Sequence, residues 1–266
     1  MFDRYNRHIN YLRISVTDRC NLRCRYCMPE EGVQWLIPDD ILSFEEIVDV
    51  VTTATRMGIN KIRLTGGEPL VRKDIVRLTG MIAAIKDVKD LALTTNGILL
   101  GEMAGDLKSA GLMRVNVSLD TLDPVKFKVL TRGGNIHQVF NGIQAAIEAG
   151  LYPVKINCVV SDSPDGEDAM RVKEFALLKG LSVRFIRQMD LETGRFGIVD
   201  GGEGGNCRIC NRLRLTANGM VKPCLFGEQE FSVRKMGAEQ ALIAALDSKP
   251  LKGCVNRIGR FYNIGG

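Results

Sequence analysis

Three cysteines near the start of the chain, Cys20, Cys24 and Cys27, have a spacing that suits an iron–sulfur cluster. Three thiolates on one loop can bind three corners of a [4Fe–4S] cluster and leave the fourth iron open. An open iron can chelate the amino and carboxylate groups of S-adenosylmethionine, and Tyr26, directly before the third cysteine, suits a contact with adenine. The alternatives are chance clustering and zinc, which normally has four closed ligands in a structural site.

A second cysteine set lies in the last quarter of the chain, where Cys207 and Cys210 are followed after thirteen residues by Cys224. We interpret this set as a second [4Fe–4S] site with one iron free to bind substrate. Two arginines between its second and third ligands add positive charge where an anionic substrate would lie. With Cys254 as a fourth ligand the set also suits a zinc ribbon, so Cys254 is left without an assigned role.

Single cysteine and histidine residues elsewhere carry no comparable pattern. Cys158 alternates with the polar residues Lys155 and Asn157, so we expect a buried structural thiol. His8 and His137 have no recognisable partners and are expected to be ordinary polar residues rather than ligands.

The elements that position these residues repeat along the first 190 residues. Short β-branched segments predict six strands, at residues 11–17, 61–65, 90–95, 113–118, 153–160 and 181–187. Helical patterns lie between them, and the first has a capping box formed by Ser43 and Glu46. Four predicted helices end in a glycine and an apolar residue, at Gly58, Gly111, Gly150 and Gly180. This βα repeat predicts a parallel sheet, and six strands predict an α/β fold with a partial (βα)6 TIM-like barrel.

Polar and apolar residues alternate along the predicted strands, whereas parallel strands covered on both faces usually have continuous apolar runs. The helices must bury the apolar face, so the polar face should line the barrel lumen. That face carries Arg13, Arg63, Lys155 and Arg184, and buried charge is costly unless it is compensated. We therefore predict a polar, anionic ligand, and phosphate suits the planar guanidinium well. An antiparallel sheet with one solvated face is the alternative.

Further polar segments follow the predicted strands at their carboxyl ends. They are Gly66-Gly67-Glu68-Pro69, Thr94-Thr95-Asn96-Gly97, Ser118-Leu119-Asp120 and Gln188-Met189-Asp190. Parallel barrels build their active sites on that face. The glycine pair permits a close approach of backbone to a ligand.

Composition limits the partners. The chain has 266 residues, a net charge of +5 and no run of 18 apolar residues, which argues against a membrane span. The mild charge suits an anionic small molecule rather than nucleic acid. Eight cysteines without a secretory signal favour metal or redox chemistry in the cytoplasm over disulfides.

These motifs together resemble a known family. The cysteine run at residues 20–27 resembles the signature of the radical S-adenosylmethionine superfamily. Residues 12–29, 61–74, 93–97, 114–124 and 213–226 and the closing Gly265-Gly266 resemble the GTP 3′,8-cyclase family of molybdenum cofactor biosynthesis. The likeness spans nearly the whole chain. It implies a lyase with two [4Fe–4S] clusters that cleaves S-adenosylmethionine to a 5′-deoxyadenosyl radical. This radical takes the ribose 3′-hydrogen of GTP, and the carbon radical then attacks guanine C8.

The resemblance also implies roles for individual residues. The ligands of the two clusters are Cys20, Cys24 and Cys27, and Cys207, Cys210 and Cys224. The S-adenosylmethionine contacts are Tyr26, Gly66, Gly67, Glu68, Ser118 and Met189. The GTP contacts are Arg13, Arg63, Thr94, Lys155, Arg184, Arg212 and Arg214. Arg13 and the tail residues Gly265 and Gly266 assist catalysis. The implied partners are an electron donor such as flavodoxin or ferredoxin and a downstream pterin synthase, and a homodimer is compatible with the pattern.

Two departures separate this chain from the family pattern. A glycine-rich segment at 193–206 replaces several dozen residues before the second cysteine set, and Arg187 stands where the family usually has glutamate. Either this is a trimmed cyclase, or a two-cluster radical enzyme acting on another nucleotide or a peptide. A non-catalytic zinc-and-nucleotide binding module is the third hypothesis. We divide the chain into a radical barrel at 1–192 and a second-cluster extension at 193–266.

Overall fold

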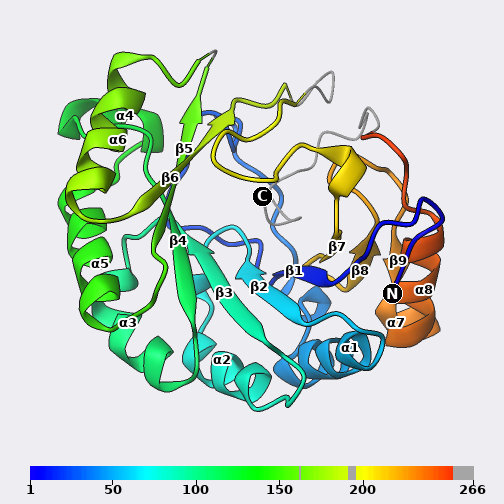
Figure 1. Ribbon diagram of the computed structural model, residues 1–266. Coiled ribbons are helices and arrows are strands. Elements are labelled where there is room, and N and C mark those ends of the chain that lie inside the picture. The colour runs from blue at the N-terminus through cyan, green and yellow to red at the C-terminus, as the bar shows by residue number, and fades with distance from the viewer. Residues whose placement is uncertain (162, 191–195, 254–266) are drawn as a thin grey trace.

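A curved sheet with helices on its outer side forms the frame of the molecule (Figure 1). The computed structural model describes residues 1–161, 163–190 and 196–253. Its strands are β1 (Tyr11–Ser15), β2 (Lys61–Thr65), β3 (Asp90–Thr95), β4 (Arg114–Ser118), β5 (Lys155–Val160), β6 (Ser182–Arg187), β7 (Arg212–Leu215), β8 (Met220–Lys222) and β9 (Phe231–Ser232). The order across the sheet is β6-β5-β4-β3-β2-β1-β7-β8-β9. Neighbours from β6 to β7 are parallel, and the two last pairs are antiparallel.

The helices are those that the βα repeat predicts, together with two in the C-terminal part. They are α1 (Phe44–Arg56), α2 (Ile75–Ala83), α3 (Leu100–Ser109), α4 (Pro124–Thr131), α5 (Ile136–Glu148), α6 (Glu167–Leu178), α7 (Val233–Met236) and α8 (Ala238–Asp247). The capping box of Ser43 and Glu46 is present at the start of α1. Gly58 and Gly111 have φ values of +95° and +99°, which L side chains rarely adopt, so the chain can turn directly from a helix into the next strand.

The core lies between the sheet and the helices. Leu12, Ile14, Ile62 and Leu64 are fully buried there, and the charged residues that alternate with them point to the concave side. Cys158 is also fully buried, as its alternation predicts. The six predicted strands and the partial barrel are confirmed.

Strand β7 is the main addition to the predicted fold. It lies beside β1 in parallel register, with Arg214 opposite Arg13 and Arg212 opposite Tyr11. The sequence offered one signal, the alternation in Arg-Leu-Arg-Leu, but four residues flanked by cysteines are too short to identify a strand. Because β7 is hydrogen-bonded to β1, the C-terminal residues continue the barrel sheet. The division at 192/193 stays a prediction.

The glycine-rich segment is anchored at two points in its described part, 196–206. Asp200 and Phe185 exchange both backbone hydrogen bonds at 3.0 Å, so the segment pairs with the outer edge of β6. At its start, the rings of Phe196 and Phe226 stack with centroids 4.5 Å apart. Residues 196–206 therefore connect the edge of β6 to the region of the second cysteine set.

No described helix is long and apolar enough to cross a membrane.

Candidate functional site

The loop of Cys20, Cys24 and Cys27 follows β1 and is held at its base by α4. The backbone N–H groups of Arg23 and Arg25 donate to the last carbonyls of that helix, at 3.2 and 3.0 Å. Burial, together with the charge of neighbouring thiolates, raises the pKa of Cys20 to about 11 and of Cys24 to about 12. The three thiols therefore influence one another's charge on this loop.

Three thiols on one loop match the protein ligands of a [4Fe–4S] cluster whose fourth iron is open. In a [4Fe–4S] cluster each thiolate binds a different iron, so its ligands stand farther apart than those around zinc. Positive iron would offset the charge repulsion that opposes thiolate formation here.

Tyr26 is fixed in this loop by a carboxylate from the neighbouring strands. Its hydroxyl donates to Oδ2 of Asp120 at 2.7 Å, while Oδ1 of Asp120 accepts the backbone N–H of Val159 at 2.8 Å. Burial raises the pKa of Asp120. Asp120 thus ties the cysteine loop to the ends of β4 and β5, a positioning role that the sequence alone did not assign.

Gly66 and Gly67 lie against the backbone of the cysteine loop. A Cβ atom on Gly66 would stand 2.6 Å from the carbonyl oxygen of Thr17, and one on Gly67 would stand 2.5 Å from that of Asp18. Any side chain at either position would therefore push the loop away from β2. The glycines serve close approach, as their type predicts, although the group approached in the structure is backbone rather than ligand.

Glu68 is completely buried behind this contact. Its carboxylate accepts hydrogen bonds from Leu70 N–H at 3.1 Å, the Thr95 hydroxyl at 2.7 Å and Asn96 N–H at 2.7 Å. Burial raises the pKa of Glu68 to about 7, and these three donors oppose the shift. Ser118 and Met189 are half-buried at the carboxyl ends of β4 and β6. Their contact with S-adenosylmethionine stays a prediction.

Cationic side chains fill the concave face of the sheet. Arg13 lies opposite Arg63 on one side and Arg214 on the other, so three guanidinium groups share one level of the barrel. Arg63 is 3% exposed; it donates through Nη1 to the Thr94 hydroxyl at 3.1 Å and through Nε to the Tyr11 hydroxyl. The predicted substrate residues of β1, β2, β3 and β7 are thus brought together.

The other predicted substrate-binding cations add to the positive electrostatic field of the lumen. Burial lowers the pKa of Lys155, and Arg184, Arg114 and Arg63 lower it further, which places all four in one electrostatic neighbourhood. Burial also lowers the pKa of Arg214 to about 10, with Arg212 adding to the effect.

Two buried nitrogen atoms point to a ligand in this field. Nε of Arg184 and Nε of Arg212 are buried and have no hydrogen-bond acceptor within the described part of the chain. Arg114, on the same face, donates from Nε to the carboxylate of Asp90 at 2.8 Å. The remaining excess of positive charge and the unused donors fit a polyanion such as a triphosphate.

Tyr11 was not among the predicted site residues. Burial raises its pKa, but the charges of Arg63, Arg13 and Arg212 outweigh that effect, so the net shift is downward. The same alternation that identified Arg13 places Tyr11 on the lumen face, and this was the available signal.

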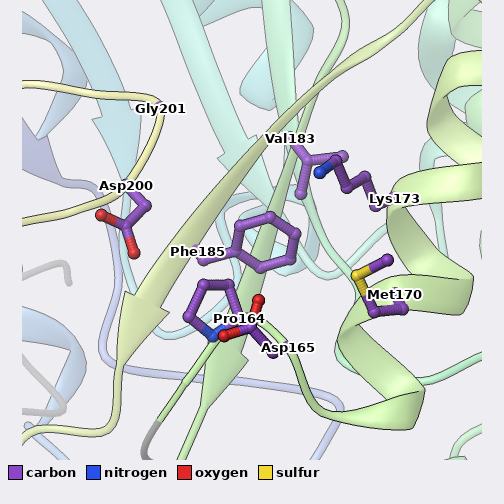
Figure 2. A pocket seen from close by; sticks show the side chains of 8 residues that line it. All are labelled: Pro164, Asp165, Met170, Lys173, Val183, Phe185, Asp200 and Gly201. Carbon is purple, nitrogen blue, oxygen red and sulfur yellow. The ribbon is translucent and has the colours of Figure 1, made fainter.

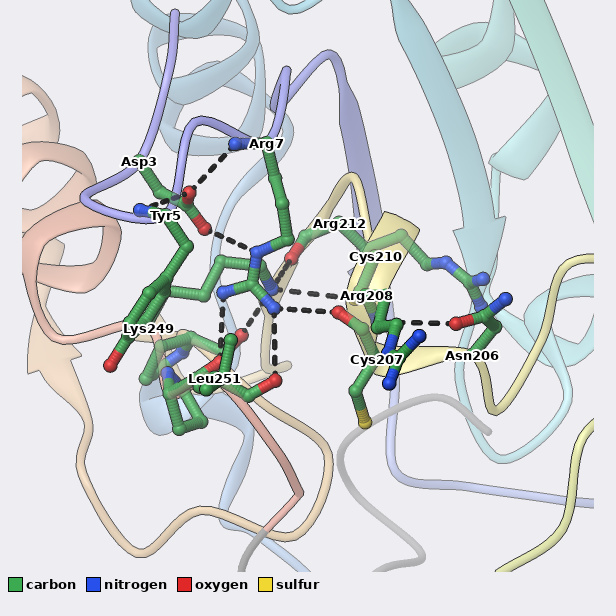
Figure 3. Close-up of polar contacts among 12 residues, drawn as sticks. Asp3, Tyr5, Arg7, Asn206, Cys207, Arg208, Cys210, Arg212, Lys249 and Leu251 are labelled. Carbon is green, nitrogen blue, oxygen red and sulfur yellow. Dashed lines mark hydrogen bonds and ion pairs between the residues drawn. The ribbon is translucent and has the colours of Figure 1, made fainter.

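The second cysteine set lies at the other side of β1, around β7. Cys207 and Cys210 bracket a short 3-10 turn before β7, and Cys224 follows β8. Figure 3 shows the contacts behind this turn. Arg7 donates to the Cys207 carbonyl at 2.7 Å and forms a buried ion pair with Asp3 at 2.7 Å. Three thiols on this short stretch fit the chemistry of a second cluster, and Cys254, Gly265 and Gly266 lie outside the described residues.

A hollow of about 270 Å³ lies on the opposite face of β6, away from these groups (Figure 2). Phe185, Met170 and Pro164 line it together with Asp200. Phe185 alternates with Arg184 along β6, so the hollow faces away from the lumen. Its position does not support a role in the radical chemistry.

Comparison with known proteins agrees with this geometry. Residues 14–176 match the Radical SAM superfamily, and residues 179–253 match the family described as Molybdenum Cofactor Synthesis C. The fold and the cysteine loops therefore define a radical S-adenosylmethionine protein, a class that binds an iron–sulfur cluster and S-adenosylmethionine.

Curated relatives narrow the class. A GTP 3′,8-cyclase of Desulforamulus reducens is 42% identical, covering 95% of this chain and 93% of that protein. A GTP 3′,8-cyclase of Geobacter sulfurreducens is 43% identical, covering 88% of this chain and 86% of that protein. The chain belongs to the GTP 3′,8-cyclase family.

Solved structures share the fold at low identity. Methylornithine synthase (PylB) aligns with a TM-score of 0.57 and 17% identity over 95% of this chain and 72% of that chain. Streptococcus suis SuiB bound to S-adenosylmethionine aligns with a TM-score of 0.54 and 19% identity, over 65% of this chain and 39% of that chain.

The alignment with the Desulforamulus reducens protein also reveals a difference in length. It spans 306 residues but covers 95% of a chain of 266, or about 253 residues, so about 50 aligned positions have no counterpart here. This difference in length agrees with the short glycine-rich segment that precedes the second cysteine set.

Proposed function

We propose that this protein converts GTP to (8S)-3′,8-cyclo-7,8-dihydroguanosine 5′-triphosphate in molybdenum cofactor biosynthesis. The observation that carries the proposal is the cationic lumen flanked by the two cysteine sets. Arg13 stands at its centre, on the strand that leads into the first cysteine loop, and Arg214 stands beside it, on the strand between the ligands of the second. A triphosphate bound there would hold its nucleoside between the two loops.

The cysteine ligands are proposed as the family pattern assigns them. Cys20, Cys24 and Cys27 would hold the first [4Fe–4S] cluster, which with S-adenosylmethionine supplies the radical that removes the ribose 3′-hydrogen. The second cluster would be held by Cys207, Cys210 and Cys224. Residues 1–192 would form the radical barrel and 193–266 the extension that carries this second site.

The chain's own side chains bind and orient the reactants. Arg63, Arg184 and Arg212 would bind phosphate oxygens, with Thr94 held beside Arg63 by their hydrogen bond. Gly66, Gly67 and Glu68 would shape the S-adenosylmethionine site. Glu68 keeps a carboxylate beside the cysteine loop, where a methionyl amino group would need an acceptor.

The glycine-rich segment supports a trimmed cyclase. Arg212 donates from Nη2 to the carbonyl of Glu203 at 3.1 Å, and a Cβ on Gly202 would stand 3.1 Å from Nε of Arg184. The short segment thus lies directly over two predicted phosphate ligands. Glycine lets the backbone of the segment approach these two side chains closely.

Redox and metabolic partners are proposed on the same basis. The reaction needs a low-potential electron donor such as flavodoxin or ferredoxin, and its product would pass to a pterin synthase. We propose a cytoplasmic location, since the cluster thiols require a reducing compartment.

The binding of GTP is expected to weaken at alkaline pH through Lys155. Burial and the nearby arginines lower its pKa in the free protein, so its charge is lost on raising the pH before that of an ordinary lysine. Affinity measured by calorimetry from neutral pH to about pH 10 should therefore fall in wild type. Lys155→Arg keeps its charge over this range and should fall less. Tyr11 titrates equally in wild type and in Lys155→Arg, so it cannot cause a difference between them. Equal loss of GTP affinity with pH in the two proteins would therefore contradict a charged role for Lys155.

The C-terminal glycines give a second expectation. Deleting Gly265 and Gly266 should suppress product formation while S-adenosylmethionine cleavage and iron content persist, because small terminal residues can enter a crowded site and meet the lumen arginines. Product and 5′-deoxyadenosine are quantified in the same reaction. Equal amounts of product from the truncated and the full-length protein would show that Gly265 and Gly266 do not assist the reaction.

Substrate choice tests the proposal directly. The reconstituted protein is incubated without oxygen with S-adenosylmethionine, a strong reductant and GTP, ATP or CTP in turn. We expect a new nucleotide product with GTP alone. A colourless, zinc-containing protein would support the binding-module hypothesis, whereas a product from another nucleotide would support a different radical enzyme.

A further inference from the structure

Lys249 is a buried lysine, 2% exposed, that lies behind the second cysteine set and has no role in the proposed function. It follows α8, which packs against α1, β8 and β9. Burying a lysine is costly unless its charge and donors are compensated, so its place calls for a specific role.

Three acceptors surround its nitrogen. Nζ of Lys249 donates to the carbonyl of Arg212 at 2.6 Å, to the carbonyl of Pro223 at 2.8 Å and to Sγ of Cys210 at 3.4 Å (Figure 3). A neutral amine has two N–H groups and an ammonium has three. The three acceptors therefore match the three N–H groups of an ammonium.

These contacts join the two halves of the cysteine set. Arg212 follows Cys210 by two residues, and Pro223 directly precedes Cys224. One side chain thus links the turn that carries Cys207 and Cys210 to the strand end that carries Cys224. Arg7 adds a second link, because its guanidinium donates both to the Cys207 carbonyl and to the carbonyl of Pro250, which directly follows Lys249.

The surroundings of the two cysteine sets differ in charge. In the first loop, the Tyr26 hydroxyl donates to the carboxylate of Asp120 at 2.7 Å. At the second set, the nitrogen of Lys249 lies 3.4 Å from Sγ of Cys210. A positive charge in direct contact with a ligand favours negative charge at the second set.

We infer that Lys249 is a positioning residue for the second cluster, aligning Cys210 with Cys224 and stabilising negative charge on the thiolate and on the cluster that it binds. This inference rests on the proposed second cluster. Reduction adds one negative charge to a cluster, so the ammonium should make one-electron reduction of this cluster more favourable.

The test isolates the second cluster in full-length protein that carries Cys24→Ser. Lys249→Met removes the charge and the donors, Lys249→Arg keeps a charge, and Lys252→Met removes an exposed charge three residues away as the matched control. Each protein is reconstituted without oxygen. Iron is counted, and the cluster is titrated with a chemical reductant while its electron paramagnetic resonance signal is recorded.

We expect Lys249→Met to lower the equilibrium constant for one-electron reduction about tenfold, a fall of about 59 mV in midpoint potential. Lys249→Arg should recover most of this loss, and Lys252→Met should match the parent. If Lys249→Met binds no iron, recovery of iron in Lys249→Arg supports the inference, and loss in both overturns it. An unchanged potential in Lys249→Met with full iron also overturns it. A parent without any cluster would instead contradict the proposed second site.

Discussion

Cys24→Ser is expected to abolish formation of 5′-deoxyadenosine while leaving about four of about eight iron atoms per chain. The reason is that each cysteine set belongs to a separate part of the fold. The first is held by β1 and α4, and the second by β7, β8 and Lys249. Iron analysis and product quantification on the same anaerobic preparation measure both effects.

Cys158→Ser is the matched control for this substitution. Cys158 is fully buried and belongs to neither set, so its loss should leave iron content and 5′-deoxyadenosine formation close to wild type. Loss of all iron from Cys24→Ser would show that the two sets do not form independent sites.

Arg63→Ala should weaken GTP binding about ten- to a hundredfold, because a charge-assisted hydrogen bond contributes roughly 1.5–3 kcal/mol. Arg63 is buried, lies opposite Arg13 and is oriented by Thr94 and Tyr11. Binding of S-adenosylmethionine should change far less, since Arg63 points into the lumen from mid-strand. Equilibrium binding of each ligand to the reconstituted protein measures this difference.

Arg77→Ala provides the control for charge alone. Arg77 lies on α2 with its side chain 66% exposed and paired with Glu45, so removing it changes net charge equally without touching the lumen. We expect wild-type affinity for GTP. If Arg63→Ala impaired S-adenosylmethionine binding more than GTP binding, the lumen would be assigned to the wrong ligand.

The sequence predicts much of the fold because its signals are local and repeated. Alternation along β1, β2 and β5 determines which face is buried and which lines the lumen, and helix-terminating glycines such as Gly58 and Gly111 mark where each strand begins. Since parallel strands share one direction, residues on their inner faces must meet. The meeting of Arg13, Arg63 and Thr94 follows from this rule.

Features that depend on distant pairing were not predictable. Strand β7 is four residues long and gains its place from hydrogen bonds to β1, about 200 residues earlier. Lys249 is one lysine among many in the sequence, and only the fold brings it to Cys210. The same holds for the Asp3–Arg7 pair, whose partners lie at the opposite end of the chain.

The position of the glycine-rich segment before Cys207 was likewise not predictable from the sequence. Glycine-rich composition alone predicts a linker, because it gives no apolar periodicity. In the structure, a Cβ on Gly201 would stand 2.6 Å from the carbonyl of Val183, so the lack of a side chain is what allows the segment to lie against β6. The backbone of Asp200 then exchanges two hydrogen bonds with that of Phe185 at the outer edge of β6.

Hydrogen transfer from C3′ of GTP tests the central claim most directly. The proposed product has the same atomic composition as GTP, so the substrate is labelled with deuterium at C3′ and incubated without oxygen with S-adenosylmethionine and reductant. Chromatography and mass spectrometry should find the deuterium in 5′-deoxyadenosine and a new nucleotide one mass unit lighter than the labelled GTP. Deuterium-free 5′-deoxyadenosine, with all of the label retained in unchanged GTP, would contradict the account.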